Sequence, residues 1–393
     1  MKKYYLDNAA TTPTDPRVLQ AMLPCFTEVY GNPSSLHAFG QTAKHLVEEA
    51  RKTVASFIEA SPEEIIFTSG GTEGNNTVVE GIAHARREKG NHVITSKIEH
   101  HSILEPCHFL EKGGFEVTLI PVNEYGLVDP DDVRKAITKK TILISIMHAN
   151  NEIGTIQLLT EISKIARENG IYFHTDAVQT FGHFPISVNE LQIDLLSASA
   201  HKLYGPKGIG ILYVRKGTRI EPILRGGDQE KRRRASTLNV PGIVGLGKAV
   251  ELAKEEVANE IEKLTVLRNM LIDGILTKIE HSRLNGHPTQ RLPNNVNISF
   301  SYVDGESMLL KLDMEGIACS TGSACTSSTL EPSHVLSAIG LPLELAHGSL
   351  RFSLGRQTTQ DNIRYVLEVL PGIISKLRSI SPAYKNVAKT LKA

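Results

Sequence analysis

The sequence predicts an α/β protein, with a three-layer, mostly parallel sheet in a large domain and a smaller α+β domain toward the C-terminus. Between residues 64 and 214, short apolar runs alternate with amphipathic segments of helical length. The chain has 393 residues, more than the roughly 250–300 at which single cores stop growing. Past Gly247 the pattern changes to a long charged helix. We therefore expect a large domain over 15–250 and a small domain built from 1–14 and 251–393.

The expected elements of the large domain follow from local spacing and composition. Residues 4–13 predict a short strand and a turn, and residues 41–57 carry apolar or small side chains at helical spacing. A helix over 159–169 is one of several that separate the buried strands. Those strands are expected at 64–68, 92–95, 116–120, 142–147, 171–173 and 211–214.

The small domain is expected to begin with a long amphipathic helix over 248–279. Apolar runs at 294–301 and 350–354 predict two strands with flanking helices. We expect the N-terminal arm to pack on this domain.

Composition excludes several classes of protein. Lys plus Arg and Asp plus Glu are each 43, so net charge provides no general attraction to nucleic acid or to an anionic membrane. Four cysteines at irregular spacing indicate neither a disulfide framework nor a paired-cysteine metal site. No apolar run is long enough to span a bilayer, and the N-terminus is polar. We expect a soluble, cytoplasmic protein.

A lysine and an acid follow two of the expected strands. One apolar run leads into His201 and Lys202, and an upstream run leads into Asp176 and Gln179. Ligands of open α/β sheets bind outside the carboxyl ends of the strands, so these side chains are expected to share a pocket. A lysine amine, an acid and nearby hydroxyls suit pyridoxal phosphate. The alternative is a solvated loop lysine.

Two further stretches are candidates for the same pocket. Residues 69–76 form a glycine-rich turn that opens a helix, expected to be regular from Thr77, and such a turn suits a phosphate group. The spacing matches neither common nucleotide motif, so a plain connection is the alternative. His100 and His101 follow a strand, where an imidazole can stack on a cofactor or move a proton. Surface histidines are the alternative, and no metal-ligand spacing occurs.

The C-terminal part supplies a thiol and two arginines. Small and hydroxyl residues surround Cys325, which makes it a candidate reactive thiol, whereas Cys319 has the setting of a buried apolar residue. Arg351 and Arg356 flank the end of a strand, and one guanidinium could clamp a carboxylate. An ordinary ion pair is the alternative for either. The basic run at 231–234 is interpreted as a solvated loop, with nucleic-acid contact as the less favoured alternative.

Together these motifs resemble the cysteine desulfurases of the NifS/IscS group, which are fold-type I pyridoxal phosphate enzymes. The similarity covers nearly the whole chain, and its motifs recur in the family's order. They are residues 6–12, 31–35, 72–76, 150–154, 175–179, 201–202, 322–325, 330–334 and 351–356.

The resemblance implies a role for each candidate residue. Lys202 carries the Schiff base and moves the Cα proton, Asp176 keeps the pyridine nitrogen protonated, and Gln179 bonds the ring hydroxyl. His100 stacks on the ring. Cys325 attacks the substrate sulfur, which leaves a persulfide and releases alanine. The implied phosphate ligands are Gly71, Thr72, Ser199 and His201, joined by Thr237 from the second subunit of a homodimer, and the implied ligands of the substrate carboxylate are Asn151 and Arg356.

The resemblance also implies the partners. They are L-cysteine and a sulfur-acceptor protein, such as an iron–sulfur scaffold. The chain departs from the family pattern at Ala200, Asp228 and Ser236, where glycine is common. Two alternatives stay open: a related class V enzyme, such as a selenocysteine lyase or a small-amino-acid aminotransferase, and a non-catalytic sulfur carrier or RNA-binding subunit.

Overall fold

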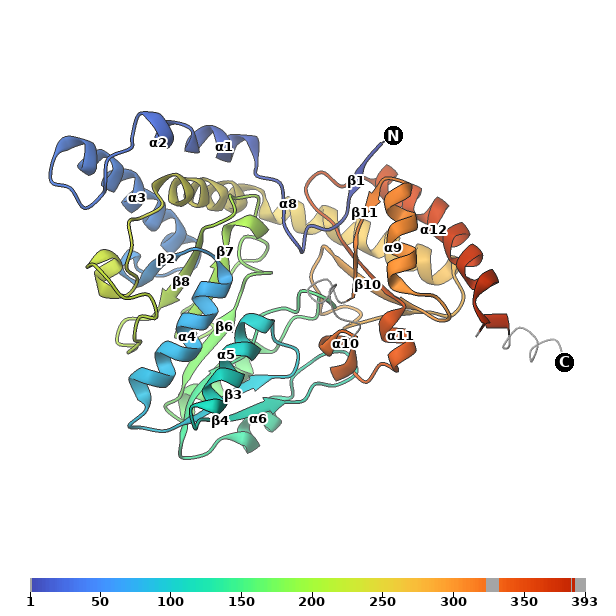
Figure 1. The fold of residues 1–393 in the computed structure, drawn as a ribbon, viewed down its shortest axis with the longest axis horizontal. Coiled ribbons are helices and arrows are strands. Elements are labelled where there is room, and N and C mark those ends of the chain that lie inside the picture. Colours follow the sequence, from blue (N-terminus) through green and yellow to red (C-terminus); the bar gives the residue numbers. More distant parts are fainter. Residues whose placement is uncertain (1, 323–331, 383, 386–393) are drawn as a thin grey trace.

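The computed structural model describes residues 2–322, 332–382 and 384–385 (Figure 1). Its centre is a seven-stranded sheet in the order β2-β8-β7-β6-β5-β3-β4. The strands run parallel from β4 to β7, while β8 is antiparallel to both of its neighbours. Their bounds are β2 Ile65–Thr68, β3 His92–Ser96, β4 Glu116–Ile120, β5 Thr141–Ser145, β6 Tyr172–Asp176, β7 Leu195–Ser199 and β8 Gly210–Val214.

Helices cover both faces of this sheet, and each face has its own apolar core. Ile65 and Phe67 of β2 belong to one core while Ile66 belongs to the other, because successive side chains of a strand point to opposite faces. The first core includes residues of α1 Pro16–Met22, α2 Pro24–Thr27, α3 Ala38–Phe57, α6 Pro130–Ala136 and α7 Leu159–Glu168. The second lies under α4 Gly71–Arg86 and α5 His101–Lys112. The predicted three-layer, mostly parallel sheet is confirmed.

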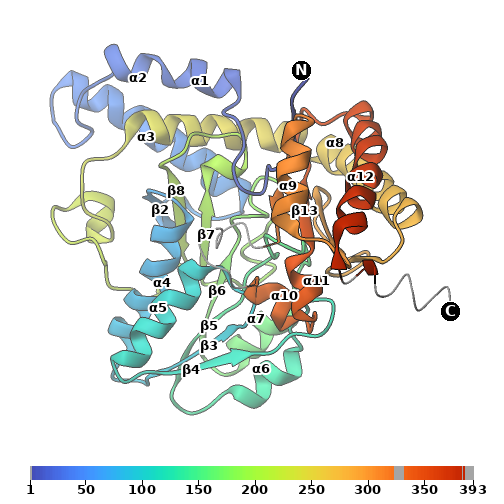
Figure 2. The same cartoon turned by 45° about the vertical axis from the view of Figure 1, so that its right-hand side comes forward.

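A second, smaller body lies beside the large sheet (Figure 2). Its four-stranded sheet has the order β12-β13-β10-β9, and β1 pairs in parallel with β11. The strands are β1 Tyr4–Tyr5, β9 Ser282–Leu284, β10 Asn295–Phe300, β11 Ile317–Ala318, β12 Ser320–Thr321 and β13 Ser349–Ser353. The helices are α9 Gly305–Met314, α10 His334–Ala338, α11 Leu343–His347 and α12 Gln360–Ile380. Leu6 of the N-terminal arm lies in the core of this body.

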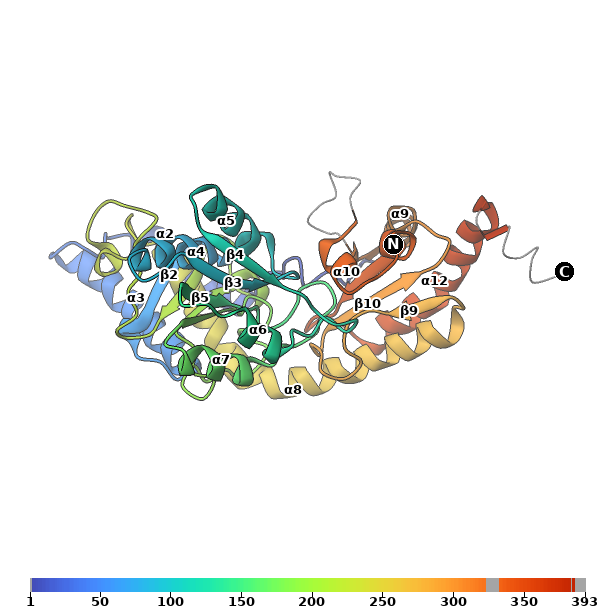
Figure 3. The ribbon, with the colours of Figure 1, turned by 90° about the horizontal axis from the view of Figure 1, so that it is seen from below.

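Helix α8, Val240–Lys278, runs beneath both bodies (Figure 3). Its N-terminal half supplies Val250 to the core of the large body and its C-terminal half supplies Leu271 to the core of the small one. The exact domain boundaries stay a prediction.

Two helices begin earlier than the sequence pattern predicts. α4 starts at Gly71, so the glycine-rich turn is already its first turn. α8 starts at Val240, because the Asn239 side chain accepts a hydrogen bond from Gly242 N at 3.1 Å and Pro241 occupies the first turn. Apolar periodicity does not reveal these starts, because the first turn of α4 is rich in glycine and polar groups and residues 240–247 of α8 include three glycines and a proline.

The segment between β8 and α8 is held to the large body by a buried carboxylate. Glu230 accepts hydrogen bonds from Arg51, at 2.7 Å, and from Phe67 N, at 3.0 Å. Ser236 in the same segment has a φ of 95°, in the left-handed region that glycine favours. Ser236, where the resemblance implies glycine, therefore carries backbone strain.

No helix within the described ranges combines the length and the apolar character that crossing a membrane requires.

Candidate active site

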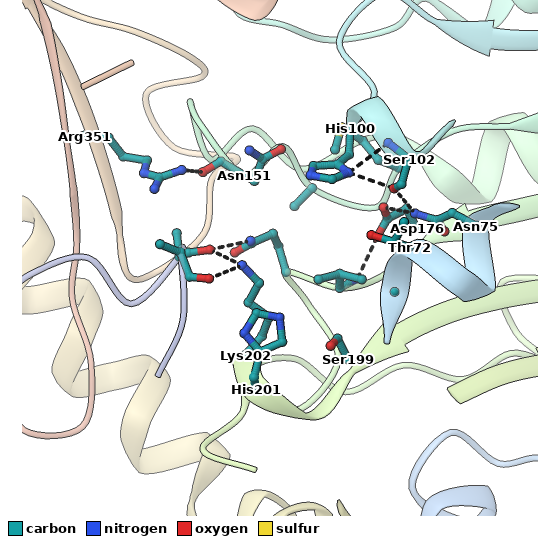
Figure 4. A pocket seen from close by; sticks show the side chains of 17 residues that line it. Thr72, Asn75, His100, Ser102, Asn151, Asp176, Ser199, His201, Lys202 and Arg351 are labelled. Atoms are coloured by element: carbon teal, nitrogen blue, oxygen red, sulfur yellow. Dashed lines mark hydrogen bonds between the residues drawn. The ribbon is translucent and has the colours of Figure 1, made fainter. Parts of the chain in front are cut away.

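A pocket opens at the carboxyl ends of the parallel strands, between the two bodies (Figure 4). Its volume of about 290 Å³ is near the lower end of the range for small-molecule sites, roughly 300–1,000 Å³. The lining residues are Ala9, Ala10, Gly71, Thr72, Asn75, His100, Ser102, Met147, Ala149, Asn151, Asp176, Val178, Gln179, Ser199, His201, Lys202 and Arg351. Asp176 ends β6 and Ser199 ends β7, which is where the fold places ligand-binding groups.

Lys202 extends into this pocket from a single 3₁₀ turn that follows β7. Its Nζ donates to the carbonyl oxygens of Ala9 and of Ala10, the latter at 2.8 Å. Gln179 Nε2 donates to the same Ala9 carbonyl at 3.1 Å. The N-terminal arm, which packs on the small body, therefore fixes the direction of the Lys202 side chain.

A chain of hydrogen bonds connects Asp176 to His100. Asn75 Nδ2 donates to Asp176 Oδ2 at 2.6 Å and to Ser102 Oγ at 2.8 Å. Ser102 Oγ lies 2.7 Å from His100 Nδ1, which also accepts from Ser102 N at 3.1 Å. Since the backbone N–H must donate, Nδ1 is the unprotonated nitrogen. Burial lowers the pKa of His100, so the neutral ring with its proton on Nε2 is favoured.

The Asp176 carboxylate is fixed from its second side as well. Val178 N donates to Asp176 Oδ1 at 2.9 Å. The side chain is 5% exposed, yet it borders the pocket. A buried carboxylate whose two oxygens are both oriented is suited to bind a cationic ring nitrogen.

The start of α4 brings further hydrogen-bond donors to the pocket. Gly71 and Thr72 begin α4, whose first turn has unpaired N–H groups and the positive end of the helix dipole. Ser199 and His201 also line the pocket. A Cβ on Gly71 would lie 2.5 Å from Val178 Cγ2, so this close approach requires glycine. The donor set suits a phosphate group.

The structure brings together most of the residues that the sequence singled out. Gly71, Thr72, His100, Asn151, Asp176, Gln179, Ser199, His201 and Lys202 all line the pocket. Thr237 is exposed and does not line it, and Cys325 lies outside the described residues. Cys319 is buried, as expected, and burial raises the pKa of its thiol.

The two arginines have different positions. Arg351, on β13, lines the pocket, donates to Asn151 O at 3.2 Å and pairs with Asp7 at 2.9 Å. Its Nε is buried and has no hydrogen-bond partner among the described residues. Arg356 lies beyond the end of β13 and pairs with Glu260 at 2.7 Å and Glu256 at 3.2 Å. The structure therefore does not bring Arg356 to the pocket lining.

Sequence reasoning missed Asn75 and Ser102. Asn75 lies one helical turn after Gly71, and that spacing was the available signal, because it places both residues on one face of α4. Ser102 follows His100 at the start of α5, a common position for a hydroxyl that accepts or donates near a helix end. No sequence signal connects either residue with Asp176.

Comparison with known proteins agrees with this arrangement. The model of the class V aminotransferases matches residues 4–366. The chain is 60% identical over 391 residues to cysteine desulfurase IscS of Dictyoglomus turgidum, covering 100% of this chain and 99% of that one. It is 58% identical to cysteine desulfurase IscS of Methanosarcina thermophila, covering 99% and 96%. The chain belongs to the cysteine desulfurase family of class V aminotransferases.

Solved structures of this family share the fold. A NifS-like protein superimposes with a TM-score of 0.90 at 38% identity, covering 95% of this chain and 100% of that one. A NifS-like protein from Rickettsia africae superimposes with a TM-score of 0.86 at 32% identity, covering 95% and 100%. The predicted membership in the cysteine desulfurases, and the fold that it implies, are confirmed.

A fully buried carboxyl group lies next to the pocket of this cysteine desulfurase. Glu99 precedes His100, and its Oε1 accepts from Ser96 Oγ at 2.6 Å and from Met147 N at 3.0 Å. Its Oε2 is buried and has no hydrogen-bond partner within the described ranges. Burial raises the pKa of the Glu99 carboxyl to about 8. The protonated form therefore predominates in the folded protein at neutral pH.

We predict that Glu99→Gln becomes stabilising relative to wild type as pH rises. The unfolded carboxyl loses its proton near its ordinary pKa while the folded one retains it, so Glu99 lowers stability between pH ~4.5 and ~8. The relative gain of the variant across this window should be about 1–3 kcal/mol. Thermal unfolding of both proteins at pH 5.5, 7 and 8 measures it. Exposed Glu105→Gln is the control, and a pH-independent difference in Tm would contradict the prediction.

Proposed function

We propose that this chain is a pyridoxal phosphate-dependent cysteine desulfurase, in which Cys325 receives the sulfur of L-cysteine. The observation that carries the proposal is the pocket, in which Lys202, Asp176 and His100 meet the N-terminus of α4. Membership in the family supports both the reaction and the cofactor.

The pocket residues fit the cofactor by their chemistry. The donors of Gly71, Thr72, Ser199 and His201 suit its phosphate, and burial lowers the pKa of His201 to about 4, so that this ring is neutral. Asp176 would hold the ring nitrogen, and Gln179 would reach the ring hydroxyl. The flat, neutral imidazole of His100 would stack on the ring.

Pyridoxal phosphate, when bound, supplies an electron sink for the Cα carbanion of the substrate. Lys202 binds the cofactor and transfers protons at Cα. The Cys325 thiolate attacks the substrate sulfur, the carbon–sulfur bond breaks, its electron pair stays with the substrate, and Cβ takes up a proton equivalent to the one that the Cys325 thiol lost. One thiol and one cysteine thus become one persulfide and one alanine, without an external oxidant or reductant.

Arg351 is proposed to bind the substrate carboxylate together with Asn151. Its guanidinium lines the pocket and its Nε has no hydrogen-bond partner among the described residues, so it has a donor to offer a ligand. The pairing of Arg356 with carboxylates beyond β13 leaves that residue less suited to the role that the resemblance implied. A planar guanidinium matches a carboxylate with two parallel hydrogen bonds.

A homodimer is proposed because large apolar side chains are exposed along one edge of the large body. They lie on α1, α2, the start of α3 and the segments between these helices, along the upper edge in Figure 1. Their exposures are Leu19 50%, Leu23 52%, Phe26 59%, Tyr30 65%, Leu36 93% and Phe39 57%. A patch of this kind marks an interaction surface, and a second copy would also supply Thr237, which does not line its own pocket.

The persulfide is proposed to pass to an acceptor protein, such as an iron–sulfur scaffold, and the location is proposed to be cytoplasmic. The alternative of an RNA-binding carrier is less favoured, because acidic side chains neutralise part of the charge of the basic run at 231–234. Arg232 pairs with Asp228 at 2.6 Å and Arg234 pairs with Glu73 at 2.9 Å, which offsets part of its charge.

The first test is the absorbance spectrum of the purified protein, together with alanine and sulfide release from L-cysteine. We expect a cofactor band near roughly 400–430 nm that depends on Lys202. Lys202→Ala should abolish the band and Cys325→Ser should lower alanine release at least about 100-fold. Exposed Lys207→Ala and buried Cys319→Ala are the matched controls and should retain both signals. A wild-type protein without the band after added pyridoxal phosphate would refute the cofactor assignment.

Arg351→Lys separates the roles of the two arginines. Lysine keeps the positive charge beside Asp7 but cannot form the paired hydrogen bonds, so KM for L-cysteine should rise about 10- to 100-fold with the cofactor band unchanged. Steady-state kinetics and the spectrum measure this. If KM were unchanged in Arg351→Lys but raised in Arg356→Lys at unaltered Tm, Arg356 and not Arg351 would be the residue that binds the substrate carboxylate.

The dimer is tested by Phe26→Asp, which places a charge within the exposed apolar patch. Light scattering after size-exclusion chromatography should report a dimer for wild type and a shift toward monomer for the variant. Phe109→Asp is the control, because Phe109 is 61% exposed on α5, away from the patch. A monomeric wild type, or a variant that stays fully dimeric, would contradict the proposal.

A further inference from the structure

The backbone of the turn that carries Lys202 is held by a histidine that lies outside the pocket lining. His183 Nε2 lies 2.8 Å from the carbonyl oxygen of Lys202. A carbonyl oxygen can only accept, so His183 Nε2 is the donor. The His183 side chain is 11% exposed and follows β6, the strand that ends at Asp176.

A buried carboxylate on α8 lies on the other side of this histidine. Glu260 Oε1 is 3.6 Å from His183 Nδ1, and Glu260 Oε2 accepts from Arg356 Nε at 2.7 Å. Burial acts to raise the pKa of Glu260, but the neighbouring His183 and Arg356 outweigh it and hold that pKa below its usual value. Glu260 is therefore ionised and lies between His183 and Arg356. Its Oε2 accepts the hydrogen bond from Arg356, whereas its buried Oε1, 3.6 Å from His183 Nδ1, accepts no hydrogen bond among the described residues.

Arg356 in turn contacts both bodies of the molecule. Its backbone N donates to the Tyr204 hydroxyl at 2.7 Å, and its guanidinium lies 4.3 Å above the Tyr204 ring. Tyr204 comes two residues after Lys202, and Arg356 comes five residues after Arg351 on the chain that leaves β13. The same guanidinium lies 3.6 Å from Asp15 and 3.2 Å from Glu256, which are nearer the surface and compete with Glu260 for it.

We propose that His183, Glu260 and Arg356 form an interdomain tie, a set of positioning residues that fixes the Lys202 turn relative to Arg351. Lys202 belongs to the large body and Arg351 to the small one. The distance between the Lys202 amine and the Arg351 guanidinium therefore depends on how the two bodies are joined. A buried ionised chain of contacts fixes that distance more rigidly than surface contacts do. Misplacement of reacting groups by about 1 Å can cost about 100-fold in rate.

The central position of Glu260 explains why the tie needs a charge there. With a neutral side chain at this position, Arg356 would be attracted only by the carboxylates of Asp15, which caps α1, and of Glu256, one turn earlier on α8. His183 would lose its anionic neighbour, and its donation to the Lys202 carbonyl would become less directed. The tie thus depends on one buried carboxylate that holds a group on each side.

The tie rests on the proposed function, and its test uses the cofactor-loaded, full-length protein with three variants. Glu260→Gln and His183→Leu each break one link, while His183→Gln keeps a donor for the Lys202 carbonyl. Exposed Glu255→Gln, on the same helix, is the matched control. We expect KM for L-cysteine to rise about tenfold in the two breaking variants, with a smaller change in kcat, and to be largely restored in His183→Gln.

A readout independent of activity is hydrogen–deuterium exchange in the cofactor-free protein. Peptides covering 199–206 should exchange at least about threefold faster in Glu260→Gln and His183→Leu than in Glu255→Gln, with the sheet strands unchanged. Unchanged KM and unchanged exchange in 199–206, or a uniform increase over the whole chain, would overturn the tie. A wild-type protein that lacks the cofactor band would instead refute the proposed function and leave the exchange result interpretable.

Discussion

The site depends above all on the shared direction of the strands in the large sheet. Every strand of that sheet except β8 points its carboxyl end toward the pocket. The side chains that follow these ends come from distant parts of the sequence, yet they meet at one edge. Asp176 ends β6, Ser199 ends β7, and His100 comes a few residues after β3. A site built at the ends of buried strands is more precisely positioned than one built on loops alone.

The electrostatics of the pocket are arranged by groups that do not themselves react. Asn75 and Ser102 link the Asp176 carboxylate to the His100 ring and decide which ring nitrogen carries the proton. On the opposite side, the N-terminal arm orients Lys202 through two carbonyl oxygens. A cationic ring nitrogen would thus meet a carboxylate at one end of the pocket while the reacting amine approaches from the other. In a buried site such fixed dipoles are stronger than they would be in water.

Much of this site was predictable because residue type and strand ends coincide. Lys202, Asp176 and His100 each follow an apolar run, and the rule that ligands bind at carboxyl ends was enough to bring them together. The choice between Arg351 and Arg356 was not predictable. They are five residues apart, and their side chains differ in direction because Arg351 lies within β13 whereas Arg356 lies beyond its end and is attracted by carboxylates of α8. Long-range partners such as Glu260 leave no trace in local spacing.

The start of α10 joins the small body to residues beside the pocket. Ser333 and His334 are the residues at this start. Ser333 Oγ donates to Glu152 Oε2, and His334 Nε2 donates to the backbone carbonyl of Glu99 at 2.9 Å. Each of these two glutamates is the sequence neighbour of a pocket residue, since Glu152 follows Asn151 and Glu99 precedes His100.

The backbone of Glu152 is also held by the small sheet. Its carbonyl accepts from Asn295 Nδ2 at 3.2 Å and from Asn297 Nδ2 at 3.1 Å, both on β10. Burial raises the pKa of the Glu152 carboxyl to about 7, so near neutral pH both its protonated and ionised forms are populated. Either form can accept the Ser333 hydrogen bond, and only the ionised form attracts the nearby Arg351 guanidinium. The residues adjacent to His100 and Asn151 are therefore hydrogen-bonded directly to the small body.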